Sequence, residues 1–470
     1  MAPPIPTAAS TPLLALLTAV LSISIKTIYN LYFHPLAKFP GPLAHRATRL
    51  AYLCRYVRGT LSRDLLAFHN QYGPIVRIAP NELAFNSPEA WREIYGHKAE
   101  EFPKLQAFYR PRKAPANMVT ETRFNHRNLR LQIAPQFSDR SMREQEPVFR
   151  KYVNLLITQL REHAVDPDRK DEKTGLQAQR PLDMVAWYTW TTFDIIGDLA
   201  FGEPFGCLDK ASEDPWIKSI FDAFSKAPYM ACTTYLGLDN LLLPILRYFI
   251  GKGREMHDRS TEDKLRRRME MKGGRHDLIE GFLSNSESLN LDFKGLKANA
   301  SVLIIAGSET TSTLLSGTTY LLLRNPDQLK RLTDEVRSSF SSEDEITLLS
   351  VGKLNYMLAC LNEGLRLYPP VPVGLPRVVP KGRGNVAIAG AVVPDDVSSV
   401  PPHPFPIPNM KPGKTVVAVW QWAAYHSEAN FKDPFGFHPE RFLRDPKFGN
   451  DKLDILQPFS VGPRNCVGRK

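Results

Sequence analysis

The chain has 470 residues, of which 43% are hydrophobic and 23% charged, a composition that is ordinary for a globular protein with a large core. Its formal net charge of +11 favours an acidic partner or an anionic membrane surface, and the absence of any nucleic-acid-binding motif excludes nucleic acid as an expected partner. The 5 cysteines are odd in number, widely spaced and without a C-x-x-C pair. This pattern argues against a disulfide framework and a zinc site, and it fits a reducing, cytosol-facing location.

An apolar run begins at Leu13 and continues, interrupted by Lys26, to Phe33. It reaches the roughly 20 residues of a membrane-spanning helix if the lysine side chain extends along the helix to the interface. No Lys or Arg precedes the run, whereas Lys26 and Lys38 follow it, so the bulk of the chain should face the cytosol. A cleaved signal peptide is the alternative, but its charged first segment and Ala-x-Ala site are missing. We therefore predict a transmembrane anchor at residues 1–33.

A proline-rich hinge is expected at residues 34–42, because Pro35, Pro40 and Pro42 fix backbone angles and prevent a helix from continuing. The sequence after it predicts a mainly α-helical domain with small β-sheets (an α+β fold) over residues 43–470. Residues 75–79 alternate between apolar and polar side chains and predict a strand, with residues 83–85 able to pair back.

Several stretches of the middle of the chain are explained by structure alone. Residues 184–200 have the spacing of a core helix, and the polar stretch 162–181 predicts a solvated loop. The basic run 266–268 is flanked by acidic residues and predicts a solvated helix face. Residues 123–137 predict a basic helix that carries His126 and Arg130 on one face, which is typical of a surface helix.

A long helix is predicted from about residue 295 to 324, and it is apolar nearly all round, so it should be buried. Glu309 and Thr310 interrupt this apolar surface, and burial of unpaired polar groups is costly. The threonine hydroxyl can simply bond back to the carbonyl one turn earlier. The functional alternative is a local opening at Gly307 that admits a small ligand and water, to which an acid beside an alcohol can relay protons.

Glu363 and Arg366 are three residues apart, which places both side chains on one helix face. Such a pair is a weak signal alone, because an exposed pair contributes only a few tenths of a kcal/mol. The helix is stopped by prolines from Pro369 onward, and an apolar segment with the single cation Arg377 follows.

The final stretch, residues 459–468, reads Phe-Ser-Val-Gly-Pro-Arg-Asn-Cys-Val-Gly. Its cysteine, Cys466, lies near an arginine, and a neighbouring cation lowers the pKa of a thiol. Flanking glycines let the backbone approach a large flat group. A buried structural cysteine is the alternative for a lone thiol. The full spacing Phe-x-x-Gly-x-Arg-x-Cys-x-Gly resembles the haem-ligating loop of the cytochrome P450 family, the haem-thiolate monooxygenases.

Further segments carry the same resemblance in the same order along the chain. The hinge, the acid-alcohol pair and the Glu-x-x-Arg pair are each similar to segments of that family, and residues 193–205 are similar to its fungal secondary-metabolism branch. The resemblance implies haem b (iron protoporphyrin IX) as cofactor, with an axial thiolate from Cys466. It implies that Thr310 holds dioxygen and Glu309 supplies protons.

The resemblance also implies roles for other residues. Contacts to haem or its carboxylates would come from His126, Arg130, Arg377, Phe459, Arg464 and Gly468. Glu363, Arg366 and Arg441 would form a structural cluster that supports the haem loop. The implied partners are NADPH-cytochrome P450 reductase, with cytochrome b5 as a second donor, dioxygen and a hydrophobic small molecule. The implied location is the endoplasmic reticulum membrane, with the catalytic domain in the cytosol.

Two features depart from the family pattern. Residues 396–412 are dense in proline, cannot pair as strands and read as an insertion, which we interpret as translated non-coding sequence; a tolerated surface loop is the alternative. The sequence ends at Lys470, where the family continues into a helix that packs beneath the haem, so we expect the 470-residue chain to hold haem poorly. Two rival functions follow: a truncated remnant without haem, and a haem-thiolate isomerase or dehydratase.

Overall fold

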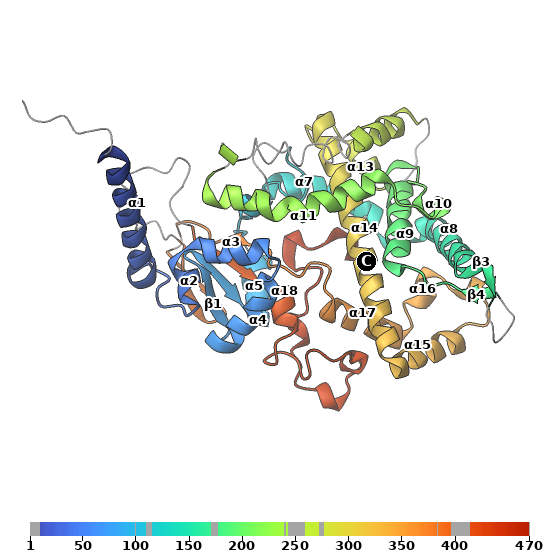
Figure 1. The fold of residues 1–470 in the computed structure, drawn as a ribbon. Coiled ribbons are helices and arrows are strands. Elements are labelled where there is room, and N and C mark those ends of the chain that lie inside the picture. The colour runs from blue at the N-terminus through green and yellow to red at the C-terminus, as the bar shows by residue number, and fades with distance from the viewer. Residues whose placement is uncertain are drawn as a thin grey trace, which may run out of the picture. The chain divides into compact units, whose positions relative to one another are not determined.

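Helices dominate the computed structural model, and small sheets accompany them, as the sequence predicts (Figure 1). The structure describes residues 10–98, 100–109, 115–170, 177–238, 241–242, 259–271, 277–382, 384–395 and 414–469. The proline-dense stretch 396–412 therefore lies outside the described residues. The chain divides into two units, one of residues 1–105 and 373–424 and one of residues 106–372 and 425–470.

The first unit begins with helix α1 (Ser10–Ile28), which a short π-helical turn, η1 (Tyr29–Phe33), continues. Within it, residues 16–33 have a mean hydropathy of 1.4, and only 6% of this window is buried. By length and composition this helix can cross a membrane. Its leucine and isoleucine side chains are exposed, so they have no partner in the protein core.

The proline-rich segment 34–42 packs against the first strand of this unit. The backbone N–H of Arg77 donates to the carbonyl of Pro40 at 2.7 Å, and Leu36 is fully buried. A Cβ at Gly41 would lie 2.3 Å from the carbonyl oxygen of Arg77, so this position has no room for a side chain. The segment is thus attached to the folded unit along part of its length.

A four-stranded sheet in the order β1-β2-β8-β5 forms the centre of the first unit. The strands β1 (Ile75–Ala79) and β2 (Glu82–Phe85) pair antiparallel, which confirms the predicted strand pair. Strand β8 (Val416–Val419) runs parallel to β2 and antiparallel to β5 (Arg377–Val378). A separate ribbon joins β6 (Asn385–Ile388) to β7 (Ala391–Pro394).

Short helices accompany this sheet. Helix α5 has a clear start signal, because the Ser87 hydroxyl accepts the N–H of Ala90 and Pro88 occupies the first turn. The helices are α2 (Leu43–Ala47), α3 (Arg49–Val57), α4 (Leu61–Tyr72), α5 (Pro88–Tyr95) and, at the end of the unit, α18 (Gln421–Tyr425).

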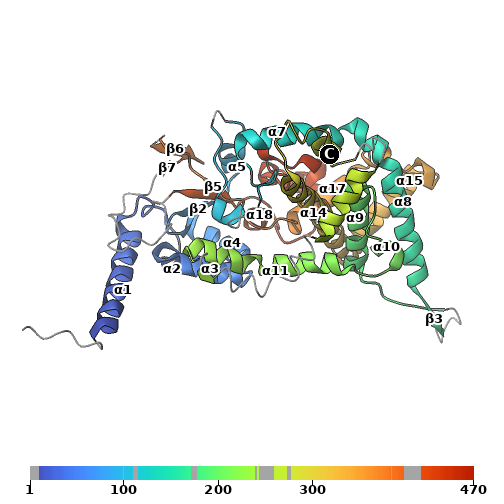
Figure 2. The same ribbon diagram turned by 90° about the horizontal axis from the view of Figure 1, so that it is seen from above.

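The second unit is built around two apolar helices, α9 (Met184–Phe201) and α14 (Phe293–Arg324), which lie side by side in Figures 1 and 2. Close approach is possible because Gly307 on α14 has no side chain: a Cβ there would lie 2.7 Å from the Ile196 side chain of α9. Leu303 and Ile304 of α14 join Phe193 of α9 in one buried hydrophobic cluster. This packing confirms the predicted long helix and its burial toward α9, whereas other positions, such as Tyr320 and Leu323, are exposed.

The remaining elements of the second unit are mostly helices and short 3₁₀ turns. The helices are α6 (Gln106–Tyr109), α7 (Arg123–Ile133), α8 (Asp139–His163), α10 (Cys207–Lys210), α11 (Pro215–Leu236), α13 (Glu280–Ser284), α15 (Pro326–Ser339), α16 (Leu348–Val351) and α17 (Asn355–Leu367), and residues 259–270 are also helical. The 3₁₀ turns are η2 (Ala134–Phe137), η3 (Glu343–Glu345), η4 (Pro439–Leu443), η5 (Pro446–Phe448), η6 (Leu453–Ile455), η7 (Gly462–Arg464) and η8 (Val467–Arg469).

Two local expectations were wrong. The stretch 162–181 is not only a loop, because β3 (Val165–Lys170) and β4 (Gln177–Gln179) pair antiparallel; their polar sequences lack the alternation that marks a half-buried strand. The basic run 266–268 is not uniformly solvated either. Arg268 is 4% exposed and forms ion pairs with Asp277 and Glu280. Both acids lie beyond the helix that carries Arg268, so the charge pattern of this helix could not predict these pairs.

Candidate active site

The loop of residues 459–468 is closed at its base by a backbone hydrogen bond from Cys466 N–H to the carbonyl of Phe459 at 2.8 Å. Ser460 and Gly462 both have positive φ, at 57° and 75°, which turns the chain sharply. Val467 packs against the hydrophobic cluster that contains Leu303 and Ile304 of α14. The loop is thereby anchored on both sides of the cysteine.

Within this loop the side chain of Cys466 is exposed, which is unusual for a free cysteine. Gly468 is also exposed, and a Cβ there would lie 4.0 Å from the Cys466 sulfur and 3.7 Å from the Phe137 ring. The thiol therefore lies beside backbone without a side chain. A buried structural cysteine, the alternative reading of this motif, does not fit this exposure.

The pKa of the Cys466 thiol is raised, chiefly because nearby protein atoms desolvate it. The backbone N–H of Gly468 and the charge of Arg130 act in the opposite direction and lower this pKa. Desolvation by these neighbouring atoms outweighs both effects on the pKa although the thiol is exposed at the surface, so the protein without a bound cation does not favour a free thiolate. The cation that acts on the thiol is Arg130 of α7, whereas the sequence pointed to the arginine within the loop.

Both arginines assigned to this region donate to peptide carbonyls. Arg130 donates from Nη1 to the backbone carbonyl of Asn465 and from Nη2 to its Oδ1, both at 2.6 Å. Arg464 donates from Nη1 to the carbonyl of Glu121 at 3.0 Å. These contacts tie the loop to the last turn of α7 and to the segment just before this helix. His126, on the same helix, is buried.

Helix α14 is continuous through the acid-alcohol pair. The Thr310 hydroxyl donates to the carbonyl of Ala306 at 2.7 Å, which is the back-bonded geometry of the structural alternative. A hydroxyl that donates in this way still has lone pairs with which to accept. Ala306 and Gly307 are exposed on this apolar helix, and the missing side chain of Gly307 also lets α9 pack close to it.

The pKa of Glu309 is raised by desolvation, and a hydrogen bond from the Thr313 hydroxyl partly offsets this shift. The side chain is half-buried and has no ion pair among the described residues. An acid in this position keeps its proton to a higher pH than an exposed glutamate. It therefore has the chemistry of a proton donor.

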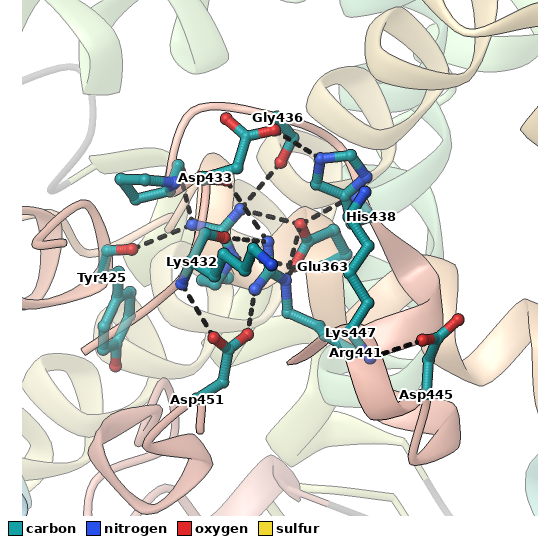
Figure 3. A network of polar contacts seen from close by, with 12 residues as sticks. Glu363, Tyr425, Lys432, Asp433, Gly436, His438, Arg441, Asp445, Lys447 and Asp451 are labelled. Carbon is teal, nitrogen blue, oxygen red and sulfur yellow. Dashed lines mark hydrogen bonds and ion pairs between the residues drawn. The ribbon is translucent and has the colours of Figure 1, made fainter. Parts of the chain in front are cut away.

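In the second unit the structure brings Glu363, Arg366 and Arg441 together, and all three side chains are buried. Figure 3 shows Glu363 and Arg441 within this network. Arg366 donates from Nη2 to Glu363 Oε1 at 2.7 Å, and Arg441 contributes an ion pair at 3.0 Å to the other carboxylate oxygen. Asp451 pairs with Arg441 from the opposite side. Asp451 could not be predicted from the sequence, since no fixed spacing connects it to the other members of the cluster.

Arg366 also fixes the loop that precedes η4. Its guanidinium donates to three backbone carbonyls, those of Tyr425, Pro434 and Gly436, at 2.9, 2.6 and 3.0 Å. Glu363 in turn accepts the backbone N–H of His438 at 2.9 Å. A planar fork of donors suits such simultaneous binding of carboxylate and backbone.

Arg377, in the first unit, is buried and donates from Nη1 to Glu101 Oε1 at 3.0 Å and to the carbonyl of Phe102 at 2.9 Å. Its Nε has no hydrogen-bond partner within the described part of the chain. A buried charged donor without a partner is costly and suits a ligand carboxylate.

Residues of the second unit fit a haem group by their donor chemistry. The loop offers an exposed thiol next to an exposed glycine, and α14 offers an exposed face of small residues. A grouping of three or more His, Cys, Asp or Glu side chains that could hold a separate metal ion is not found in the described residues. A soft thiolate ligand is typical of haem-thiolate iron.

Known proteins resemble this chain over nearly its whole length. The family model described as Cytochrome P450 matches residues 40–403 and 408–470. The cytochrome P450 monooxygenase tpeC of Talaromyces stipitatus is 44% identical over 97% of this chain and 84% of its own length. The cytochrome P450 monooxygenase prhB of Penicillium brasilianum is 44% identical over 97% of this chain and 88% of its own.

The averantin hydroxylase of Dothistroma septosporum is 40% identical over 96% of this chain and 80% of its own length. Identity of this extent, together with the matching fold class and the cysteine loop, identifies the enzyme class. The chain therefore belongs to the cytochrome P450 family and is a haem-dependent monooxygenase.

Proposed function

We propose that the Cys466 thiolate is the axial ligand of haem b and that the enzyme inserts one oxygen atom from O2 into a hydrophobic small molecule. The exposed thiol of Cys466 in the closed loop 459–468 is the observation that carries this proposal. When bound, the haem iron supplies the oxygen activation, and an electron-rich thiolate favours O–O cleavage. Phe459 and Gly468 would shape the backbone around the ligand.

Glu309 and Thr310 are proposed to manage protons and oxygen in the site. The raised pKa of Glu309 supports its role as a proton source. The Thr310 hydroxyl, held by the Ala306 carbonyl, can accept or donate a hydrogen bond without moving its helix. His126, Arg130, Arg377 and Arg464 are proposed to stabilise the haem carboxylates, since guanidinium groups bind carboxylates with several donors.

Electrons are proposed to come from NADPH-cytochrome P450 reductase, with cytochrome b5 as a second donor. The sequence has no flavin or nicotinamide fingerprint, so a separate reductase is required. Basic residues of the loop, Arg464 and Arg469, suit an acidic partner.

Residues 1–33 are proposed to anchor the enzyme in the endoplasmic reticulum membrane, with residues 43–470 in the cytosol. The exposed apolar surface of α1 supports this role.

A hydrophobic secondary metabolite is the proposed substrate. Support comes from the fungal relatives, one of which is named as a hydroxylase of averantin. Ligand sites of such enzymes are mostly apolar, in agreement with the apolar α9–α14 core beside the exposed stripe of small residues.

The ligand assignment is tested with Cys466→Ser in the full chain. In the fraction of the parent chain that takes up added haem, we expect the reduced carbon monoxide complex to give the thiolate type of Soret shift, and we expect the variant to lose it completely. Cys54→Ser is the matched control, because Cys54 is also exposed but lies on α3. Retention of the thiolate spectrum in Cys466→Ser would contradict the assignment. Failure of the parent chain to bind haem would favour the remnant without cofactor.

A further inference from the structure

Asn465, the residue immediately before the cysteine, is bound through both of its oxygen atoms by one side chain. The guanidinium of Arg130 donates to the backbone carbonyl and to the side-chain Oδ1, each at 2.6 Å. Both residues are half-buried, so water competes only partly for these bonds. A planar guanidinium that donates to two atoms of one residue fixes orientation as well as distance.

The two contacts constrain different torsions of the loop. The bond to the carbonyl fixes the peptide that links Asn465 to Cys466, and the bond to Oδ1 fixes the asparagine side chain. The backbone N–H of Asn465 meanwhile donates to the carbonyl of Gly462 at 3.1 Å. The orientation of the peptide before the cysteine is thus set from α7, an element more than three hundred residues earlier in the chain.

Arg130 can do this and still serve a haem carboxylate. A guanidinium has five N–H donors, and the two bonds to Asn465 use one on each Nη. The contact from Arg464 to the carbonyl of Glu121 adds a second link between the loop and the start of α7. The two cations therefore hold the loop in addition to any contact with a ligand.

We propose that Asn465 is a positioning residue for Cys466, acting through Arg130 to hold the thiol in the orientation that a metal requires. The asparagine amide is neutral, so it accepts from the guanidinium without cancelling the positive charge beside the sulfur. This inference rests on the proposed ligation of haem iron by Cys466. The hydrogen-bonded link itself exists with or without that ligation.

The test compares three variants. Asn465→Ala removes the side-chain acceptor, and Asn465→Asp keeps an oxygen at the same position. Arg130→Lys keeps the positive charge but loses the planar guanidinium that makes both hydrogen bonds. Arg127→Gln is the control, because Arg127 is an exposed cation on the same helix. The first measurement is hydrogen exchange of the peptide that contains residues 459–469, in the haem-free full chain. The second is the rate at which the reduced carbon monoxide complex loses its thiolate spectrum in mild urea.

Asn465→Ala and Arg130→Lys should each speed both processes roughly tenfold, the size expected for losing a hydrogen bond to a charged group. In the exchange measurement, which does not depend on the charge beside the sulfur, Asn465→Asp and Arg127→Gln should stay within about twofold of the parent. The double variant Asn465→Ala/Arg130→Lys should be no faster than the worse single variant, because both remove one link. Additive effects, or parental exchange in Asn465→Ala, would overturn the proposal. A parent chain without a thiolate spectrum would refute the ligation alone, since the exchange measurement still reports the link.

Discussion

Glu363 and Glu309 are both acidic residues on helices of the second unit, but their surroundings differ. Glu363 on α17 is fully buried and is bound by two arginines and a backbone N–H. Glu309 on α14 is half-buried, has no ion pair among the described residues and accepts from the Thr313 hydroxyl. The charge of Glu363 is thus balanced by two guanidinium groups, whereas Glu309, in the described part of the chain, has only a hydroxyl group as its hydrogen-bond donor.

This difference separates a structural carboxylate from one that can exchange a proton. A buried charge without a partner costs several kcal/mol, and the two arginines that pair with Glu363 offset this cost. Glu309 lacks such partners, and desolvation raises its pKa instead. Groups whose pKa is perturbed by burial in this manner gather at functional sites.

Replacement of Glu363, the acid that is paired with arginines, should cause the largest loss of stability. Glu363→Gln leaves Arg366 and Arg441 buried with one carboxylate fewer, and breaking a buried ion pair costs about 3–5 kcal/mol. We expect a loss of this size in the free energy of unfolding, measured by urea denaturation of the full chain. Glu343→Gln is the control, since Glu343 is exposed and its loss should cost less than about 0.5 kcal/mol. A loss below about 1 kcal/mol in Glu363→Gln would show that the cluster is dispensable for stability.

Removal of the uncompensated acid should affect turnover more than stability. Glu309→Gln keeps the shape of the side chain but cannot release a proton, and a positioned acid contributes about a hundredfold or more to rate. We expect turnover to fall about a hundredfold while the urea midpoint stays close to that of the parent. The measurement is the rate of NADPH-dependent product formation with a matched reductase. Unchanged turnover would remove Glu309 from the proton path, and product formation by the parent without consumption of NADPH or oxygen would favour the isomerase or dehydratase.

The sequence predicted the parts of this comparison that depend on local spacing. The three-residue spacing of Glu363 and Arg366 placed them on one helix face, and the apolar run around Glu309 predicted its burial. The third member of the cluster, Arg441, came only through resemblance to a family. Periodicity cannot reveal it, because the two segments are far apart in the chain and meet only after folding.

Contacts between distant segments explain what the sequence did not reveal. Asp451 pairs with Arg441, and Asn465 is bound by Arg130 across most of the second unit's sequence, yet neither acceptor has a distinctive local pattern. The assignment of Arg377 to a ligand carboxylate likewise gave no hint that Glu101 binds it. The sequence indicated which arginines have a structural or binding role, but the partner of each arginine became known only from the fold.

The smallest expected effect is a pH-dependent change in the free energy of unfolding when Glu309 is replaced. The pKa of Glu309 in the folded chain is raised above its ordinary value of 4.5. Below that value the acid is protonated in both states; as pH rises, the unfolded chain loses the proton first, so stability falls until the folded pKa is passed. Glu309→Gln lacks this loss and should become slightly more stable than the parent over the pH range above 4.5, by an amount limited by the partial exposure of the side chain. Urea unfolding of both proteins across that range measures the difference, and parallel profiles would mean that folding leaves the pKa of this acid unchanged.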